Sequence, residues 1–316
     1  ERSLKRILAG HETITITREE MKDNHTKVDL DATADVCFCL EGTYPYVSGG
    51  VSTWVHQIIT QLPDLRFSLF YIGAEKTKDQ ELKYVLPPNV IEIHNCFIFD
   101  KDSLGRKSKD RSNSLKNIED DLPKFCRIFR NCLELRIIDP ATVGSDHDAN
   151  VLAGDLELLE CLLGLCRQHS FDTFWRSQEV WNELQHFYAT LLPDKSYAEV
   201  FWTIRSLLIP IWNLLTAFSS VPVAKVYHSA SNGYAGLLGA LASRQYSRPF
   251  ILSEHGIYIR ERIVDLLNLE WKPRQWNSLT SSTVLPIDPL RELWIQLFLQ
   301  IGKITYSSAS AVVALF

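Results

Sequence analysis

Three consecutive stretches decide the fold of this protein: Val36-Cys-Phe-Cys-Leu40, Glu41-Gly-Thr-Tyr-Pro-Tyr-Val-Ser-Gly-Gly50, and the segment from Val51 to Leu62. The first is a short, continuous apolar run, which is typical of a strand buried on both faces. The second is rich in turn-forming residues. In the third, apolar residues recur at helical spacing until Pro63, which predicts an amphipathic helix. A strand, a glycine loop and a helix in this order open a doubly wound α/β domain.

The alternation of strands and helices continues along the chain. Further elements are predicted as strands at 67–72, 90–93, 223–227 and 250–253, as helices at 234–243, about 259–267 and 289–304, and as the beginning of a strand at the end of the chain. This order predicts a Rossmann-like, mainly parallel sheet over residues 34–316. The polar segment 1–33 shows little periodicity and is predicted to be an arm outside that domain.

A long helical insertion is predicted between the two groups of strands. Residues from about 115 to 220 show mainly helical periodicity, with breaks near Pro140, Ser170 and Pro193. The insertion holds four of the eight tryptophans, namely Trp175, Trp181, Trp202 and Trp212. We expect these rings to lie mostly in the core, while any exposed subset would offer a surface to a partner. The basic segment 101–112 is interpreted as a solvated loop, with a docking patch as the alternative.

The longest apolar stretch runs from Phe201 to Phe218 and approaches the length of a membrane span. It contains Arg205, Pro210 and Asn213, which are costly in hydrocarbon. We therefore favour a buried helix over a span or a re-entrant segment. No basic segment followed by an apolar run opens the sequence, so no signal peptide is predicted.

Composition excludes several classes of protein. The 316 residues are 46% hydrophobic and 22% charged, with a net charge of −5, which argues against disorder, collagen and coiled coil and gives no support for nucleic-acid binding. The seven cysteines lack the spacing of a disulfide framework. Cys37-x-Cys39 lies in an apolar run without a second pair, so no metal site is predicted. Reduced thiols in a cytoplasmic protein fit this pattern best.

Gly49-Gly50 is the first candidate binding element, because it stands at the predicted start of a helix directly after a strand. Two glycines let backbone N–H groups approach an anion, and the helix dipole favours negative charge there. The pattern is neither a Walker loop nor Gly-x-Gly-x-x-Gly. A tight turn that requires positive φ remains an equally common explanation.

Two further strand-exit loops carry groups that suit a sugar or a phosphate. The loop after 223–227 supplies His228, Ser231 and Asn232, and the loop after 250–253 supplies Glu254 and His255, followed by Arg260 and Arg262. A single histidine at a strand end is more often structural than catalytic. Two at neighbouring strand ends, one of them beside a carboxylate, indicate a hydrogen-bonding cleft with positive charge. These residue types alone do not identify a reaction.

Two long stretches resemble signature segments of the PelF family, glycosyltransferases that polymerise the Pel exopolysaccharide of bacterial biofilms. They are Glu41-Gly-Thr-Tyr-Pro-Tyr-Val-Ser-Gly-Gly-Val-Ser-Thr-Trp-Val-His56 and Ser253-Glu-His-Gly-Ile-Tyr-Ile-Arg-Glu-Arg262, and His228-Ser-Ala-Ser-Asn-Gly-Tyr-Ala-Gly236 between them agrees. The resemblance runs from about residue 34 to the end of the chain and is weakest across the helical insertion.

The resemblance implies the N-terminal, acceptor-side domain of a retaining GT-B glycosyltransferase that uses a UDP-sugar. It implies that Gly49 and Gly50 approach the donor diphosphate and that His255 hydrogen-bonds the transferred sugar. Glu254, Arg260 and Arg262 would shape that wall, and His228 and Asn232 the acceptor side. Because helix dipole and basic residues stabilise the leaving diphosphate in GT-B enzymes, no metal is required.

The same resemblance implies binding partners and a second, donor-binding domain. The growing polysaccharide would be the acceptor, and inner-membrane synthase subunits would hold the enzyme at the membrane. No pair of glutamates in a donor-site context is present, so we expect the donor-binding domain to lie outside this chain and the chain alone to be inactive. A non-catalytic docking module for membrane partners is the competing function. An oxidoreductase is a third interpretation, weakened by the absence of a dinucleotide fingerprint.

Overall fold

The computed structural model describes residues 32–76, 81–100, 122–127, 145–268 and 287–315. Glu1–Ala32 and Thr33–Phe316 form two separate units, and the second carries the fold described here. Nearly all of the predicted polar arm, the basic segment 101–112 and the break near Pro140 lie outside the described residues.

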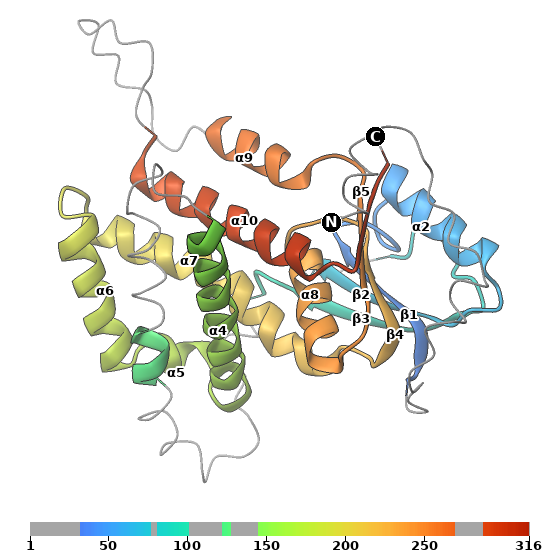
Figure 1. Cartoon of the computed structure of the whole chain (residues 1–316), viewed down its shortest axis with the longest axis horizontal. Coiled ribbons are helices and arrows are strands. Elements are labelled where there is room, and N and C mark those ends of the chain that lie inside the picture. The colour runs from blue at the N-terminus through green and yellow to red at the C-terminus, as the bar shows by residue number, and fades with distance from the viewer. Residues whose placement is uncertain (1–31, 77–80, 101–121, 128–144, 269–286, 316) are drawn as a thin grey trace, which may run out of the picture. The chain divides into compact units, whose positions relative to one another are not determined.

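A single parallel sheet forms the centre of this unit (Figure 1). Its six strands are paired in the order β3-β2-β1-β4-β5-β6, and all five pairs are parallel. The strands are β1 (Ala34–Glu41), β2 (Phe67–Gly73), β3 (Val90–Phe97), β4 (Ala224–Ser229), β5 (Phe250–Glu254) and β6 (Ala311–Ala314). The predicted doubly wound, Rossmann-like α/β fold is confirmed, and the strand order reverses between β1 and β4.

Helices cover both faces of the sheet. On one face α2 (Gly50–Gln61) packs on β1 through a cluster that includes Phe38 and Leu40. The alternate residues Cys37 and Cys39 join a larger cluster on the other face. That cluster includes residues of α8 (Tyr234–Tyr246), α9 (Tyr258–Asn268) and α10 (Pro289–Ser308). Figure 1 shows α2 and α8 on opposite sides of the sheet. Because successive side chains of β1 point to opposite faces of the sheet, they join two separate cores.

The insertion between β3 and β4 is helical where the structure describes it. It contains α4 (Ser145–Gln168), α5 (Phe171–Trp175), α6 (Gln178–Leu191), α7 (Tyr197–Ala217) and a 3₁₀ turn (Phe218–Ser220). The predicted breaks near Ser170 and Pro193 are confirmed. Ser170 caps α5 by accepting a hydrogen bond from the Thr173 N–H, and Pro193 lies between α6 and α7.

The long apolar stretch forms most of α7. Among the described residues, one helical segment, Tyr197–Ser220, has the length and composition of a membrane span, and half of it is buried inside the domain. Its polar side chains are used within the domain. Asn213 donates to the Ile98 carbonyl at 3.0 Å, and the Arg205 guanidinium lies 5.1 Å from the centre of the Phe171 ring. These contacts are those of a helix packed in a protein core.

Cysteine placement agrees with the expectation of reduced thiols. The six cysteines that the structure describes are free, and five of them are buried, namely Cys37, Cys39, Cys96, Cys126 and Cys166. Burial raises the pKa of the Cys96 thiol to about 12, with the Asp100 carboxylate adding to the effect. These thiols therefore act as small apolar core groups.

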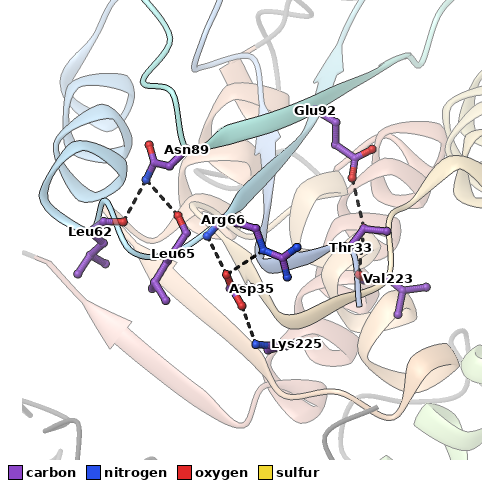
Figure 2. A network of polar contacts seen from close by, with 9 residues as sticks. All are labelled: Thr33, Asp35, Leu62, Leu65, Arg66, Asn89, Glu92, Val223 and Lys225. Carbon is purple, nitrogen blue, oxygen red and sulfur yellow. Dashed lines mark hydrogen bonds and ion pairs between the residues drawn. The ribbon is translucent and has the colours of Figure 1, made fainter. Parts of the chain in front are cut away.

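A polar network fixes the amino ends of the central strands (Figure 2). Asp35 at the start of β1 accepts a hydrogen bond from the Arg66 N–H at 2.8 Å and pairs with the Lys225 ammonium at 2.7 Å. Burial alone would raise the pKa of Asp35, but Lys225 and Arg66 outweigh burial and hold the pKa below its ordinary value. The carboxylate therefore ties the β1, β2 and β4 segments together at the edge opposite the strand exits.

Asn89 holds the far end of α2 against the sheet. Its side-chain amide donates to the carbonyls of Ile59, Leu62 and Leu65 at 3.0, 3.0 and 3.1 Å. Figure 2 shows the contacts with Leu62 and Leu65. The last carbonyls of a helix have no partners within the helix, so an outside donor satisfies them. Asn89 directly precedes β3, and this contact therefore links the end of α2 to the edge strand.

Candidate functional site

The candidate site lies at the carboxyl edge of the sheet, where β1 and β4 are neighbours but their following helices leave in opposite directions. This is the switch point at which open α/β sheets bind ligands. The exit of β1 leads to the glycines at the start of α2. His228 lies near the end of β4 rather than in its exit loop, because β4 continues to Ser229, and His255 directly follows β5.

Gly49 and Gly50 leave the start of α2 open. Gly49 has an extended backbone, with φ at 171°, and a Cβ added to either glycine would meet nothing within 4 Å. A turn that requires positive φ is therefore not the reason for these glycines; the positive φ of this loop is at Gly42. No side chain caps α2, and its first turn holds no acidic residue. The first N–H groups of the helix are thus accessible to an anion.

Trp54, in the first turns of α2, joins the glycine loop to both histidines. Its ring stands edge-on to His255, with centroids 4.6 Å apart, and edge-on to His228 at 5.7 Å. His228 also stacks on Phe38 of β1 at 4.8 Å. His228 Nε2 lies 2.8 Å from the Ser253 hydroxyl oxygen. Side chains of β1, α2 and β4 and the residue after β5 therefore meet at one aromatic centre.

Both histidines are neutral at pH 7. Burial, together with the neighbouring His255, lowers the pKa of His228 to about 4. Burial also lowers the pKa of His255. The His255 Nε2 atom is buried and has no hydrogen-bond partner among the described residues. A neutral imidazole donates from one ring nitrogen and accepts at the other, which is suited to a hydroxyl group of a ligand.

A second cluster of polar groups lies on the other face of the same edge. Glu41, the last residue of β1, accepts hydrogen bonds from the Tyr234 N–H at 2.8 Å and from the Tyr258 hydroxyl at 2.8 Å. Arg262 in turn donates to the Tyr258 hydroxyl at 3.2 Å. Burial raises the pKa of Glu41, and these hydrogen bonds oppose that rise. Glu41 thus caps α8 and links it to α9.

Glu254 belongs to this second cluster rather than to the histidine side. Its carboxylate accepts hydrogen bonds from the Tyr306 hydroxyl at 2.8 Å and from the Tyr258 N–H at 3.4 Å. Burial raises the pKa of Glu254, while these bonds and the Asn232 amide lower it. Glu254 and His255 are consecutive in the sequence, yet one contacts α9 and α10 and the other contacts α2.

Asn232 also lies on the α8–α10 side. It is fully buried, and its side-chain oxygen accepts the Gly233 N–H at 2.7 Å. Its Nδ2 faces Glu254 and Tyr306 closely enough to lower both pKa values, but it makes no hydrogen bond of good geometry. Asn232 and His228 are therefore not brought together as one acceptor-side pair.

The two arginines occupy different positions. Arg260 is exposed, and no hydrogen bond or ion pair joins it to the residues that the structure describes. Arg262 is partly buried beside Tyr258 and lies 5.3 Å from the centre of the Phe298 ring. Arg260 is thus available to a ligand, whereas Arg262 mainly holds α9 against Glu41 and α10.

Sequence reasoning missed Trp54, Ser253 and Glu41. Trp54 was assigned to the apolar face of a helix, where its spacing places it, and only packing shows that it also contacts the histidines. Glu41 gave a clear signal, because it is a carboxylate at the exit of the first strand. In the described part of the chain, no group of three or more His, Cys, Asp or Glu side chains could hold a metal ion.

Comparison with known proteins gives a family but no characterised relative. No curated protein and no solved structure matches this chain. One family of domains matches residues 34–316, which is all but the first residue of the unit described above. The chain therefore belongs to the family described as "Domain of unknown function (DUF3492)".

Proposed function

We propose that this chain is the N-terminal, acceptor-side domain of a retaining, UDP-sugar-dependent GT-B glycosyltransferase that polymerises a bacterial biofilm exopolysaccharide. The proposal joins the resemblance to the PelF family with one observation. At the switch point of the sheet, the uncapped helix that begins at Gly49 and Gly50 carries Trp54, whose ring contacts a neutral His255.

The chemistry of these groups suits glycosyl transfer. The N–H groups and the dipole of α2 would stabilise the negative charge of the UDP diphosphate as it leaves, without a metal ion. His255 would hydrogen-bond a hydroxyl of the transferred sugar, and Arg260 would add positive charge at the rim. His228 is hydrogen-bonded to Ser253 and contacts the Trp54 ring. It would therefore hold Trp54 in its position against His255.

Glu254 has a supporting role in this proposal. Its carboxylate is occupied by Tyr306 and Tyr258, so it fixes the exit of β5 and the start of α9 rather than contacting the sugar. Asn232 and Arg262 hold the same side. The donor-binding domain, the growing polysaccharide and inner-membrane synthase subunits would complete the enzyme at the cytoplasmic face of the membrane.

The test uses the natural protein that contains this chain, with UDP release measured over a panel of UDP-hexoses and UDP-N-acetylhexosamines. His255→Ala should lower kcat by roughly 10²-fold, the scale of one lost transition-state hydrogen bond, with little change in Tm. His186→Ala, on the exposed face of α6, is the matched control and should leave turnover unchanged. Absence of UDP release from every donor, or full activity of His255→Ala, would reject the assignment.

A docking module remains a second candidate, because one observation favours it. Trp202 of α7 is 59% exposed and Trp181 of α6 is 41% exposed, and both rings pack edge-on around Phe201. Exposed tryptophans grouped on one surface are typical of a binding face for a protein partner. Replacing Trp202 with Ser should release the protein from membranes that carry the synthase subunits if this face is the docking surface, and should leave UDP release by the free enzyme unchanged.

A further inference from the structure

A surface of aromatic and polar side chains lies along α2, on the flank away from the histidines of the candidate site. We name it the Tyr84 surface, and its members are Tyr44, Thr53, His56 and Tyr84. Trp54 and His56 are two positions apart in one helix, so their side chains project about 200° apart around its axis. The Tyr84 surface is therefore separate from the Trp54 side of α2.

Tyr84 is held over α2 by its neighbours. The Lys83 N–H donates to the Pro45 carbonyl at 2.9 Å, which ties the segment before β3 to the loop before α2. The centre of the Tyr84 ring lies 5.2 Å from that of His56 and 5.1 Å from that of Tyr44. Tyr44 is fully buried, whereas Tyr84 is partly exposed. An aromatic ring is thus fixed at the surface with part of it open to solvent.

Tyr44 orients His56. Its hydroxyl oxygen lies 3.2 Å from His56 Nδ1. Burial, with Tyr84 adding to the effect, raises the pKa of Tyr44 to about 12, so the hydroxyl keeps its proton and donates to Nδ1. In the neutral imidazole the ring proton then lies on Nε2. His56 Nε2 has no partner among the described residues and, in contrast to His255 Nε2, it is not buried. A ligand can therefore reach this N–H.

The polar groups of the Tyr84 surface carry no formal charge. The Tyr84 hydroxyl lies 3.4 Å from Thr53 Oγ1, and Thr53 is exposed. The sequence of α2 contains no Asp, Glu, Lys or Arg. Lys83, next to Tyr84 in the chain, pairs with Glu81 at 3.9 Å. Two hydroxyls and an imidazole around an aromatic ring suit a neutral ligand that is rich in hydroxyl groups and also presents C–H groups to the ring.

The Tyr84 surface adjoins the start of α2. The Thr53 N–H donates to the Gly49 carbonyl at 2.9 Å, so Thr53 lies one helical turn, about 5.4 Å, beyond the candidate anion site. The proposed function places the transferred sugar at His255, on the other flank of the helix. A glycan on the Tyr84 surface would therefore lie beside the donor without taking its place.

We propose that the Tyr84 surface binds sugar residues already incorporated into the acceptor glycan, with a pyranose ring stacked on Tyr84 and its hydroxyls bonded to Thr53 and His56 Nε2. The inference rests on the proposed function for the identity of this glycan as the acceptor. Uracil would also stack on an aromatic ring. Its polar groups lie along one edge, however, whereas those of a pyranose surround the ring and match hydrogen-bonding groups on both α2 and the segment before β3.

Saturation-transfer NMR of the chain tests this surface without any glycosyl transfer. The probes are cellotriose, maltotriose, tri-N-acetylchitotriose and uridine. We expect at least one trisaccharide to bind with Kd on the order of 1 mM, as for a single shallow subsite, and uridine not to displace it. Absence of binding by every trisaccharide up to about 10 mM would overturn the proposal. Displacement of the bound trisaccharide by uridine would overturn it as well.

Two variants assign the binding to this surface. Tyr84→Ala removes the ring and should weaken trisaccharide binding about tenfold or more. Tyr188→Ala is the matched control and should leave binding unchanged, because Tyr188 is also partly exposed and hydrogen-bonded through its hydroxyl but lies on α6. If Tyr84→Ala does not fold, Thr53→Val keeps the shape of an exposed side chain without its hydroxyl and should weaken binding about threefold. Unchanged affinity of the folded variant would overturn the assignment to Tyr84 and Thr53.

Glycan binding and catalysis can fail separately. In the natural protein that contains this chain, Tyr84→Ala should raise the KM for the acceptor and leave hydrolysis of the donor without acceptor unchanged. UDP release by that protein, combined with no trisaccharide binding, would overturn the glycan surface and keep the proposed function. Trisaccharide binding that depends on Tyr84, combined with no UDP release from any donor, would keep the glycan surface and reject the proposed function.

Discussion

Trp54 shows how one side chain can define a site without chemistry of its own. Its ring contacts His228 and His255, which come from two different strand exits, and its helix begins at the glycines. Because the ring is large and rigid, it fixes the distance between the helix start and both imidazoles. The packing of Trp54 therefore positions the two histidines of the candidate site relative to the start of α2.

Gly50 can be tested with little disturbance of the fold, because a Cβ there meets nothing within 4 Å and the backbone is not in the left-handed region. In the natural protein that contains this chain, Gly50→Val should reduce turnover by an order of magnitude or more while Tm stays nearly constant, since the methyl groups would hold the diphosphate away from the N–H groups. Steady-state kinetics and thermal unfolding measure both quantities.

Gly164→Val is the matched control for this substitution. Gly164 lies in α4, and a Cβ there also has no neighbour within 4 Å. This variant should keep full turnover. Full turnover of Gly50→Val as well would leave the glycines as ordinary loop residues.

His228 makes stability depend on pH in a defined window. The unfolded imidazole takes up a proton below pH 6.5, whereas the folded one does so only near pH 4. The contribution of His228 to stability is therefore complete above pH 6.5 and is lost as the pH falls toward 4. We expect the free energy of unfolding to fall by about 2 kcal/mol from this group between pH 7.5 and 5.

Urea unfolding of His228→Gln measures that contribution by difference. The variant keeps a hydrogen-bonding group near Ser253 but cannot titrate, so its stability should change less over this window. His186→Gln replaces an exposed histidine of α6 and should keep the full dependence of the wild-type protein. Equal slopes for wild-type protein and His228→Gln would contradict a buried, neutral imidazole.

At the scale of elements, Asp35 couples β1 to the segments that carry β2 and β4 (Figure 2). Because its folded pKa is lowered, its contribution is present above the unfolded pKa of about 3.9 and is lost as the pH falls through the folded pKa. Asp35→Asn should cost about 1–2 kcal/mol at pH 7, a value limited by the exposure of Arg66 and Lys225.

Denaturation of Asp35→Asn between pH 7 and 3.5 checks this prediction. The difference from wild type should shrink below pH 4, because the Asp35 carboxylate of the unfolded chain takes up a proton there, before the folded one does. Asp64→Asn, in the exposed turn after α2, is the control and should have little effect at either pH. A constant difference down to pH 3.5 would show that the charge of Asp35 is not what holds the strands.

The sequence predicts strands best where both faces of the strand are buried. The apolar runs of β1 and β2 are buried on both faces, so every position carries the signal. β3 was predicted to end at Ile93 but continues to Phe97. It lies at the edge of the sheet and includes the partly exposed His94 and the exposed Asn95, whose polarity hides a strand in the sequence.

At the scale of the whole molecule, the proposed function predicts weak nucleotide binding by this chain alone. It offers one wall of a two-walled cleft, in which the helix start at Gly49 and Gly50 makes part of the diphosphate contacts. We expect a Kd for UDP in the millimolar range and no turnover of a UDP-sugar by residues 1–316. Calorimetry with UDP and a UDP-sugar hydrolysis assay measure the two.

Micromolar affinity for UDP would contradict the assignment of the donor site to another domain, because it would place that site in this one. Measurable hydrolysis would do the same. Gly50→Val in the isolated chain serves as the internal control for any binding observed. If binding occurs at the helix start, this variant should weaken it, whereas Gly164→Val should not.

The sequence by itself determined the order and type of the elements, the parallel α/β architecture and the strand exits that hold the histidines. These follow from local periodicity, which the chain carries whether or not it is folded. Only the tertiary structure decided that Glu254 and His255 contact helices on opposite faces and that Trp54 joins both histidines. Those outcomes depend on how helices distant in sequence pack against the sheet and one another, because burial and pairing are properties of neighbours in space.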